Sequence, residues 1–365
     1  MPDRTLHIIC PGDINQLTGG YGYLRRLVAG LRDLGEAVTV HELPGPHPFV
    51  DDSSRDAADA MMATIPDGAR VLIDGLALPV AAHAIWVDRY RLRFAALVHH
   101  PLHLENGLTP EQADILFRIE RDTLAHMQHV IVPSRTTMRG VIDLSVPADR
   151  ITIANPGTDP AEPATGSGGA DGPVILCVAT LTPRKGHLVL IDALARVKHL
   201  PWRLVLVGSD ARHPGQAAAI MAAVVERGLS ARVRMTGELS GPALEAEWQA
   251  ADLFTLVSFH EGYGMVAADA LMRGLPCIVT DAGGLAEVVP ADAGAVVFTQ
   301  QRLQFAQRRT LLGHDQQARG VAIQPMDQLQ CLSRAQRAQG LDGTEADAAA
   351  AMAGHAGGLV QGQQP

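Results

Sequence analysis

Cysteine and aromatic residues are scarce in this chain of 365 residues. It has four cysteines, and Phe, Trp and Tyr together make up 4%. Cys10, Cys177, Cys277 and Cys331 are widely separated, and no two of them form a close pair suited to a metal site or a disulfide. We therefore expect buried, reduced thiols and no disulfide framework.

Long apolar segments are also lacking. No run approaches the roughly 18 residues that a membrane-spanning helix needs. The N-terminal residues MPDRTLHIICPGD contain only a short apolar run and no signal-peptide cleavage pattern. We expect a cytoplasmic protein, for which a peripheral contact with a membrane surface stays open.

Positive charge is in deficit, because 39 acidic residues outnumber 30 Lys and Arg and give a net charge of -9. This balance argues against a nucleic-acid partner, whose phosphates would have to be neutralised by Lys and Arg. A local positive pocket for a phosphate-bearing ligand is still compatible with it. Apolar residues make up 47% and charged residues 19%, so we expect a folded protein, and the length favours two domains.

The first part of the chain alternates short apolar strands with helical patterns. An amphipathic helix follows the glycines at 19–22, and strands are expected at 5–10, 37–43, 71–76, 94–100, 129–134 and 150–157. This order is typical of a parallel sheet covered by helices. We expect a Rossmann-like domain at 1–157.

A stretch rich in Gly, Pro, Ser and Ala at 158–173 interrupts this alternation and has no periodic apolar face. The alternation then restarts, with strands expected at 174–181, 203–209, 233–239, 253–258 and 276–283. We therefore expect a linker at 158–173 and a second Rossmann-like domain at 174–297.

The strongest motif is SFHEGYGMVAADALMRGLPCIVTDAGGLAEVV at 258–289. Its pattern predicts a strand end, a tight turn containing Gly262 and Gly264, and then a helix. The first N–H groups of a helix have no intrahelical partner, and together with the helix dipole they favour an anion. Glu261 lies in the turn and Asp269 about two turns later, although a capped helix with a solvated Asp is the alternative.

This segment resembles the signature of the family 4 glycosyltransferases, which is a Glu, seven residues and a second Glu. The resemblance implies that Glu261 contacts the hydroxyls of the transferred sugar, that the amides of 263–266 hold the diphosphate, and that Asp269 binds the ribose. Asp269 departs from the family, which usually has Glu there. Its carboxylate is about one methylene shorter and reaches less far toward the ribose.

The segment ATLTPRKGHLVLIDALA at 179–195 resembles a second part of the same family. Lys185, followed by Gly186, supplies a charge beside a backbone that can approach phosphate closely, although a Lys-Gly pair alone is more often solvated. The family usually has Arg five residues ahead of this Lys. Thr180 stands there, so Arg184 is the candidate substitute. The segment at 233–240 resembles the loop whose backbone reads the base.

In the first domain, TGGYG at 18–22 resembles the family's glycine loop facing donor and acceptor. An NAD site is the alternative, because Glu42 ends a strand about 20 residues after the glycines. Arg25, however, stands where the dinucleotide fingerprint needs its third glycine.

His99 ends the fourth strand, where related enzymes place a His beside the reacting sugar, and His100 is the second candidate. A zinc site with His99, His103 and Glu105 is the alternative. It is disfavoured because Pro101 opposes the helix that would align those ligands.

The resemblance covers residues 5–297 and implies the GT-B fold, with the domain at 1–157 on the acceptor side. It implies transfer of a hexosyl unit from a UDP- or GDP-hexose donor, bound between the domains, to an unknown acceptor hydroxyl, with retention and without metal or cofactor. The residues it assigns to catalysis are His99, Lys185 and Glu261. Those it assigns to donor binding are Gly19, Gly20, Arg184, Gly237, Glu238, Leu239, Gly262, Tyr263, Gly264, Met265, Val266 and Asp269.

Two other functions stay open on the same residues, a nucleotide-sugar epimerase and a non-catalytic or impaired sugar-nucleotide binder. The second rests on Asp269, on Thr180 and on the segment 298–365, which is rich in Gln and Arg and then low in complexity. We predict that 298–365 is an atypical tail, either disordered or produced by a reading-frame shift, with a genuine divergent tail as the alternative.

Overall fold

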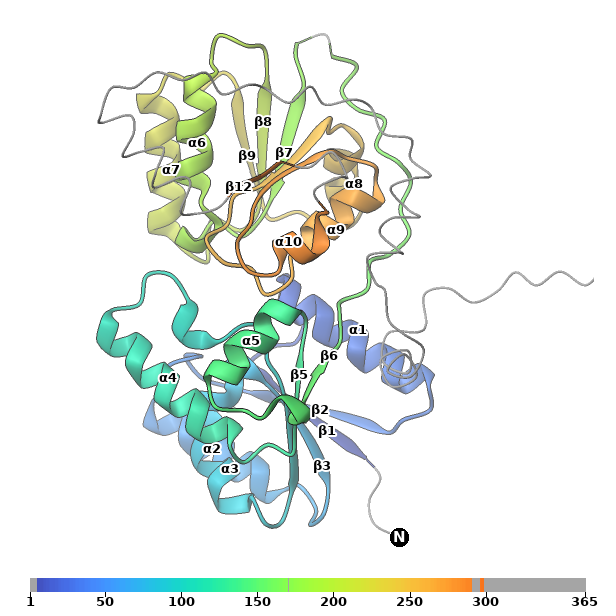
Figure 1. Ribbon diagram of the computed structural model, residues 1–365, viewed down its shortest axis with the longest axis vertical. Coiled ribbons are helices and arrows are strands. Elements are labelled where there is room, and N and C mark those ends of the chain that lie inside the picture. Colours follow the sequence, from blue (N-terminus) through green and yellow to red (C-terminus); the bar gives the residue numbers. More distant parts are fainter. Residues whose placement is uncertain (1–4, 170, 291–295, 299–365) are drawn as a thin grey trace, which may run out of the picture. The chain divides into compact units, whose positions relative to one another are not determined.

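The computed structural model describes residues 5–169, 171–290 and 296–298, the last three as backbone only (Figure 1). The described residues fall into two units that meet in sequence between Gly157 and Thr158, and each unit is an α/β structure with its own parallel sheet. The prediction of two Rossmann-like folds is thereby confirmed.

Unit 1 has a six-stranded sheet in the order β2-β1-β3-β4-β5-β6. Its strands are β1 (Leu6–Pro11), β2 (Val38–Leu43), β3 (Arg70–Asp74), β4 (Arg93–Leu97), β5 (His129–Val132) and β6 (Ile151–Ile153). Its helices are α1 (Gly19–Asp33), α2 (Asp52–Ala63), α3 (Leu78–Asp88), α4 (Pro110–Leu124) and α5 (Arg135–Asp143), with short 3-10 turns η1 (Gly75–Ala77), η2 (Leu102–Leu104) and η3 (Ala148–Arg150).

Successive side chains of a strand point to opposite faces, and the sequence of unit 1 provides apolar residues for both. Ile8 packs with Leu24 and Val28 of α1 on one face, whereas Ile9 packs with side chains of α2 and α3 on the other. The helices α2, α3 and α4 lie side by side on that second face (Figure 1).

Unit 2 has a six-stranded sheet in the order β12-β11-β10-β7-β8-β9, with Leu176 of β7 opposite Phe254 of β10. Its strands are β7 (Val174–Val178), β8 (Arg203–Val207), β9 (Val233–Gly237), β10 (Leu253–Leu256), β11 (Cys277–Thr280) and β12 (Val296–Phe298). Its helices are α6 (His187–Arg196), α7 (Pro214–Glu226), α8 (Gly241–Gln249), α9 (Met265–Met272) and α10 (Leu285–Val288), with the 3-10 turn η4 (Pro183–Lys185).

Two local features differ from the sequence pattern. Helix α1 begins at Gly19, so Gly19 and Gly20 form its first turn and not a loop before it. The segment expected to link the domains is held on unit 2, because Ala164 N donates to Arg273 O at 2.9 Å and Ser167 Oγ donates to Asp252 at 2.6 Å. Backbone hydrogen bonding thus orders a stretch that has no periodic apolar face.

Cys10, Cys177 and Cys277 are buried free thiols, as expected. The predicted tail at 298–365 lies outside the described residues except for Phe298, and Cys331 lies outside them too. Among the described helices, none combines the length and the apolar character needed to cross a membrane.

Candidate active site

The strand order of unit 2 explains why two distant loops meet. The chain runs from β7 through β8 to β9 on one side and returns to place β10 on the other side of β7. The loops that follow β7 and β10 therefore leave the sheet side by side at its carboxyl edge, which is where ligands bind in open α/β sheets. These loops carry Lys185 and Glu261.

The two loops are joined by main-chain and side-chain bonds. Phe259 N donates to Arg184 O at 2.8 Å, and Arg184 Nη1 donates to His260 O at 2.7 Å. Between them, Lys185 Nζ lies 2.5 Å from Glu261 Oε1. Three predicted site residues, Arg184, Lys185 and Glu261, are thus in one cluster.

Glu261 is a buried carboxylate, 7% exposed, that is held in its charged form. Burial alone would raise its pKa, but the charges of Lys185 and Arg184 outweigh burial and hold the pKa at about 2. Ser258 Oγ donates to Oε1 at 2.5 Å, and Arg184 Nη1 lies 3.5 Å from the same oxygen. Because all these contacts go to Oε1, Oε2 makes no hydrogen bond within the described part of the chain and can accept one from a ligand.

Three glycines allow the Glu261 loop to sit so close to its neighbours. A side chain at Gly186, which has a φ of +66°, would collide with the carbonyl of Val257. A side chain at Gly283 or Gly284 would collide with the backbone at 261–262, and Gly284 N donates to Glu261 O at 2.7 Å. The close approach of backbones requires Gly at these positions.

Helix α9 begins directly after this loop, with Gly264 as its N-cap in a left-handed conformation at φ +100°. Met265 and Val266 are its first residues, so their amides have no partner within the helix. The amide of Ala267 already donates to Gly264 O at 2.9 Å. Asp269 is half-buried one turn after Met265, on the same side of the helix.

The predicted base-reading segment 237–239 begins with the last residue of β9, which is two strands away from β7. Gly237 accepts a backbone hydrogen bond from Gly208 N at 2.9 Å, and Glu238 lies 3.8 Å from Arg212. The segment lies at the same carboxyl edge of the sheet as the Lys185 loop. Its partners are Gly208 and Arg212, which are not members of the cluster of Arg184, Lys185 and Glu261.

In unit 1, His99 is fixed at the end of β4. Its Nε2 lies 3.0 Å from Oδ2 of Asp74, a buried residue at the end of the neighbouring strand β3. Tyr23 packs against the His99 ring edge to face, and a Cβ on Gly20 would come within 3.5 Å of that ring. Gly20 and His99 are thus together, and Gly19 precedes them as the exposed first residue of α1.

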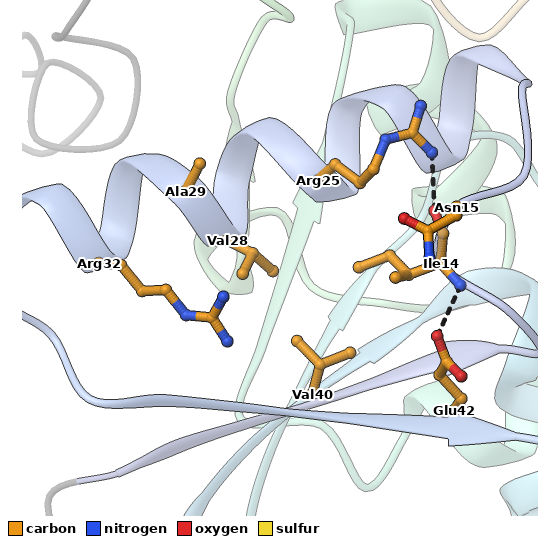
Figure 2. Close-up of a pocket in the computed structure, with 8 residues that line it drawn as sticks. All are labelled: Ile14, Asn15, Arg25, Val28, Ala29, Arg32, Val40 and Glu42. Carbon is orange, nitrogen blue, oxygen red and sulfur yellow. Dashed lines mark hydrogen bonds between the residues drawn. The ribbon is translucent and has the colours of Figure 1, made fainter.

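The carboxylate of Glu42 supports the loop that precedes α1. Its Oε1 accepts the backbone N–H of Ile14 at 3.0 Å, and Arg25 of α1 donates to Ile14 O at 2.7 Å from the other side. Figure 2 shows both side chains reaching this loop beside a cavity of about 560 Å³. Glu42 and Arg25 therefore hold the loop that leads into α1.

The three residues of the zinc alternative also have separate partners. His99 bonds to Asp74, Glu105 lies 3.1 Å from His100, and His103 lies 4.0 Å from the buried Glu120. Within residues 5–169, 171–290 and 296–298, no group of three or more His, Cys, Asp or Glu side chains could hold a metal ion.

Two contact residues were not predicted from the sequence. Ser258 bonds to Glu261, and Asp74 orients His99. A polar residue at the end of a buried strand was the available signal in both cases, because such positions meet at the carboxyl edge of a parallel sheet.

Residues 172–313 match the family model described as Glycosyl transferases group 1. The D-inositol 3-phosphate glycosyltransferase of Jonesia denitrificans is 32% identical over 139 residues, which cover 37% of this chain and 33% of that protein. The GDP-mannose:cellobiosyl-diphosphopolyprenol alpha-mannosyltransferase of Xanthomonas campestris is 27% identical over 163 residues, covering 44% of this chain and 42% of that protein. The matched part is thus less than half of either relative.

Two solved structures resemble the chain over most of its length. Sucrose-phosphate synthase from Thermosynechococcus elongatus has a TM-score of 0.67 at 21% identity, covering 85% of this chain and 90% of that one. Anabaena Alr3699/HepE in complex with UDP-glucose has a TM-score of 0.64 at 19% identity, covering 84% and 89%. At these identities the likeness shows the fold alone, which is the GT-B fold expected from the sequence.

Proposed function

Through residues 172–313 the chain belongs to the group 1 glycosyltransferases, and on this basis we propose that it moves a hexosyl unit from a nucleotide-sugar donor to an acceptor hydroxyl with retention. The observation that carries the proposal is the cluster of Lys185, Arg184 and Glu261 at the point where the strand order of unit 2 reverses. A cation and a carboxylate with one unused oxygen suit the diphosphate and the sugar of such a donor.

The donor diphosphate would be bound by cations and amides. Lys185 Nζ gives one of its three hydrogens to Glu261, which leaves two for phosphate oxygens. The amides of Met265 and Val266 and the dipole of α9 add a second group of fixed donors. Such donors stabilise the leaving diphosphate as its negative charge develops, because they are already oriented before the reaction.

The sugar and ribose would be bound by the two acids. Oε2 of Glu261 would accept a hydrogen bond from a hydroxyl of the transferred sugar, while Lys185 keeps that carboxylate ionised. Asp269 would contact the ribose, and 237–239 the base. In unit 1, we assign His99 to the reacting centre. Its Nε2 can donate only to Asp74, which orients the ring and leaves the Nδ1 edge for the substrate.

The donor nucleotide is proposed as UDP or GDP. The Anabaena structure was solved with UDP-glucose, and the Xanthomonas relative is a GDP-mannose-dependent transferase by its name. In this chain the base would meet mainly backbone at 237–239, which leaves no side-chain pattern that separates the two.

A thermal-shift panel with UDP-, GDP- and ADP-sugars tests the proposal. A ligand at about 100 times its Kd stabilises the folded state by about 2.7 kcal/mol, so a true donor raises the Tm. Lys185→Met should abolish the shift, and Lys198→Met is the matched control because Lys198 is exposed after α6. No shift with any nucleotide sugar would refute the proposal.

Turnover separates the remaining alternatives. A transferase consumes the donor only when an acceptor hydroxyl is supplied, apart from slow transfer to water. An epimerase changes the donor with no acceptor present, and a non-catalytic binder shows the thermal shift without any change in the donor.

A further inference from the structure

A second cavity in unit 1, of about 390 Å³, lies beside the residue that follows His99. Its volume falls within the roughly 300–1,000 Å³ of small-molecule sites. It is formed by the β2–α2 connection, η1, the segment 100–108 and the first turns of α4. The lining residues are Pro48, Phe49, Leu76, His100, Leu102, Glu105, Asn106, Gly107, Leu108, Gln112 and Leu116.

The lining is apolar except for a few groups. Four leucines form its walls, and Phe49 at the rim remains 43% exposed, which is high for an aromatic ring. Among the lining residues, His100 and Glu105 form an ion pair in which Nε2 lies 3.1 Å from Oε2. The side chain of His100 is 21% exposed and that of Glu105 is 37% exposed. A carboxylate has about four lone-pair sites, so Glu105 can accept a hydrogen bond from a ligand hydroxyl beside those it already makes.

Charge excludes one class of ligand. The lining contains neither Lys nor Arg, and its carboxylate, Glu105, would repel an anion. A phosphorylated acceptor needs the opposite arrangement, because phosphate is bound by guanidinium, ammonium or free helix-terminal amides. In the first turn of α4, which borders the cavity, Pro110 has no N–H and Gln112 N already donates to Thr109 Oγ1 at 3.2 Å. The cavity therefore suits a neutral, hydroxyl-bearing molecule.

The wall at 100–105 is fixed in place. Glu120, which is fully buried, accepts the amide of Leu102 at 2.9 Å, and a Cβ on Gly140 would come within 2.8 Å of the Pro101 ring. A wall held in this way is formed before the ligand binds, which reduces the entropy lost on binding.

We propose that this cavity binds the acceptor, and that the acceptor is a neutral sugar or polyol attached to an apolar group. The hydroxyl would bond to His100 and Glu105, and the apolar group would cover the leucines and Phe49. This inference rests on the proposed transferase function. It adds the class of the acceptor and excludes an acceptor phosphorylated at this end.

Calorimetry on the full chain tests the inference with three probes: octyl β-D-glucopyranoside below its micelle concentration, methyl β-D-glucopyranoside and glucose 6-phosphate. We expect the octyl glucoside to bind at least tenfold more tightly than the methyl glucoside, and glucose 6-phosphate not to bind. Tightest binding of the phosphate, or equal binding of the two glucosides, would overturn the inference.

Variants show where the probe binds. Phe49→Asp and Leu108→Asp should weaken octyl glucoside binding at least tenfold, whereas Tyr90→Asp is the matched control, since Tyr90 is 88% exposed and does not line the cavity. An equal loss in the control, or none in the cavity variants, would place the probe elsewhere and overturn the inference.

The same samples are tested for nucleotide-sugar binding. If that binding is present and the glucoside result fails, the acceptor class is wrong; if it is absent, the proposed function fails first.

Discussion

The ion pair of Lys185 and Glu261 should be as important for stability as for activity. From the sequence alone both side chains are expected to contact the donor and not the core. In the structure both are buried instead, since Glu261 is 7% exposed and the side chain of Lys185 is 14% exposed. Removing one partner would therefore leave the other charge buried without its main counter-ion.

The size of the effect follows from these contacts. Loss of one partner of a buried ion pair costs about 3–5 kcal/mol. We expect Lys185→Met near the lower end, about 3 kcal/mol, because Arg184 still lies 3.5 Å from Glu261 Oε1. In the double variant Lys185→Met with Glu261→Gln neither charge is buried, so its loss should be about 2 kcal/mol smaller than the sum of the single losses.

Urea unfolding followed by tryptophan fluorescence measures these differences. Trp202 and Trp248 are buried in unit 2 and report on it, whereas Trp86 in unit 1 is 54% exposed. A control cycle on the pair of Arg234 and Glu247, in which Arg234 is 56% exposed, should give a coupling below about 1 kcal/mol. Additive effects at Lys185 and Glu261 would refute the reasoning, as would turnover in any of these variants within about a hundredfold of wild type.

Three further predictions concern pH, the unit 1 site and the ribose contact. Burial and the charge of Lys185 lower the pKa of His187 to about 4 in the folded protein. Below the ordinary histidine pKa of about 6.5 the unfolded state therefore binds one more proton than the folded state, and unit 2 loses about 2 kcal/mol of stability between pH 6.5 and pH 5. Urea titrations should show a flatter profile for His187→Leu, and an unchanged profile would contradict this. Replacing His99 with Ala should lower kcat, and Asp74→Asn should lower it too, with nitrogen NMR showing the His99 hydrogen moved to Nδ1; a slow His100→Ala beside a normal His99→Ala would mean that the assignment is off by one residue. Asp269→Glu should tighten nucleotide binding in calorimetry, and weaker binding would mean that the site is shaped around Asp.

The strand and helix pattern could be predicted because each apolar run has the period of its element. The cluster at Glu261 could be located only through the resemblance, since nothing local to Lys185 indicates a partner 76 residues away. The role of Asp74 was missed for the same reason, because its partner His99 lies in the loop after the next strand of the sheet, β4. The start of α1 was misplaced because glycine is a poor helix former, whereas here Gly19 and Gly20 form the first turn of the helix.

The strand order of unit 2 also determines when during synthesis the proposed anion site could first form. Strands β7, β8 and β9 are neighbours in sequence and in space, so they can pair as soon as they leave the ribosome. Strand β10 must then return across them to the free edge of β7, and the glycines at 283–284 must follow before the Glu261 loop is supported. A nascent chain that ends before β11 therefore contains Lys185 and most of a sheet but has no completed anion site. If the proposed function holds, a nucleotide sugar stabilises only chains that have passed this point.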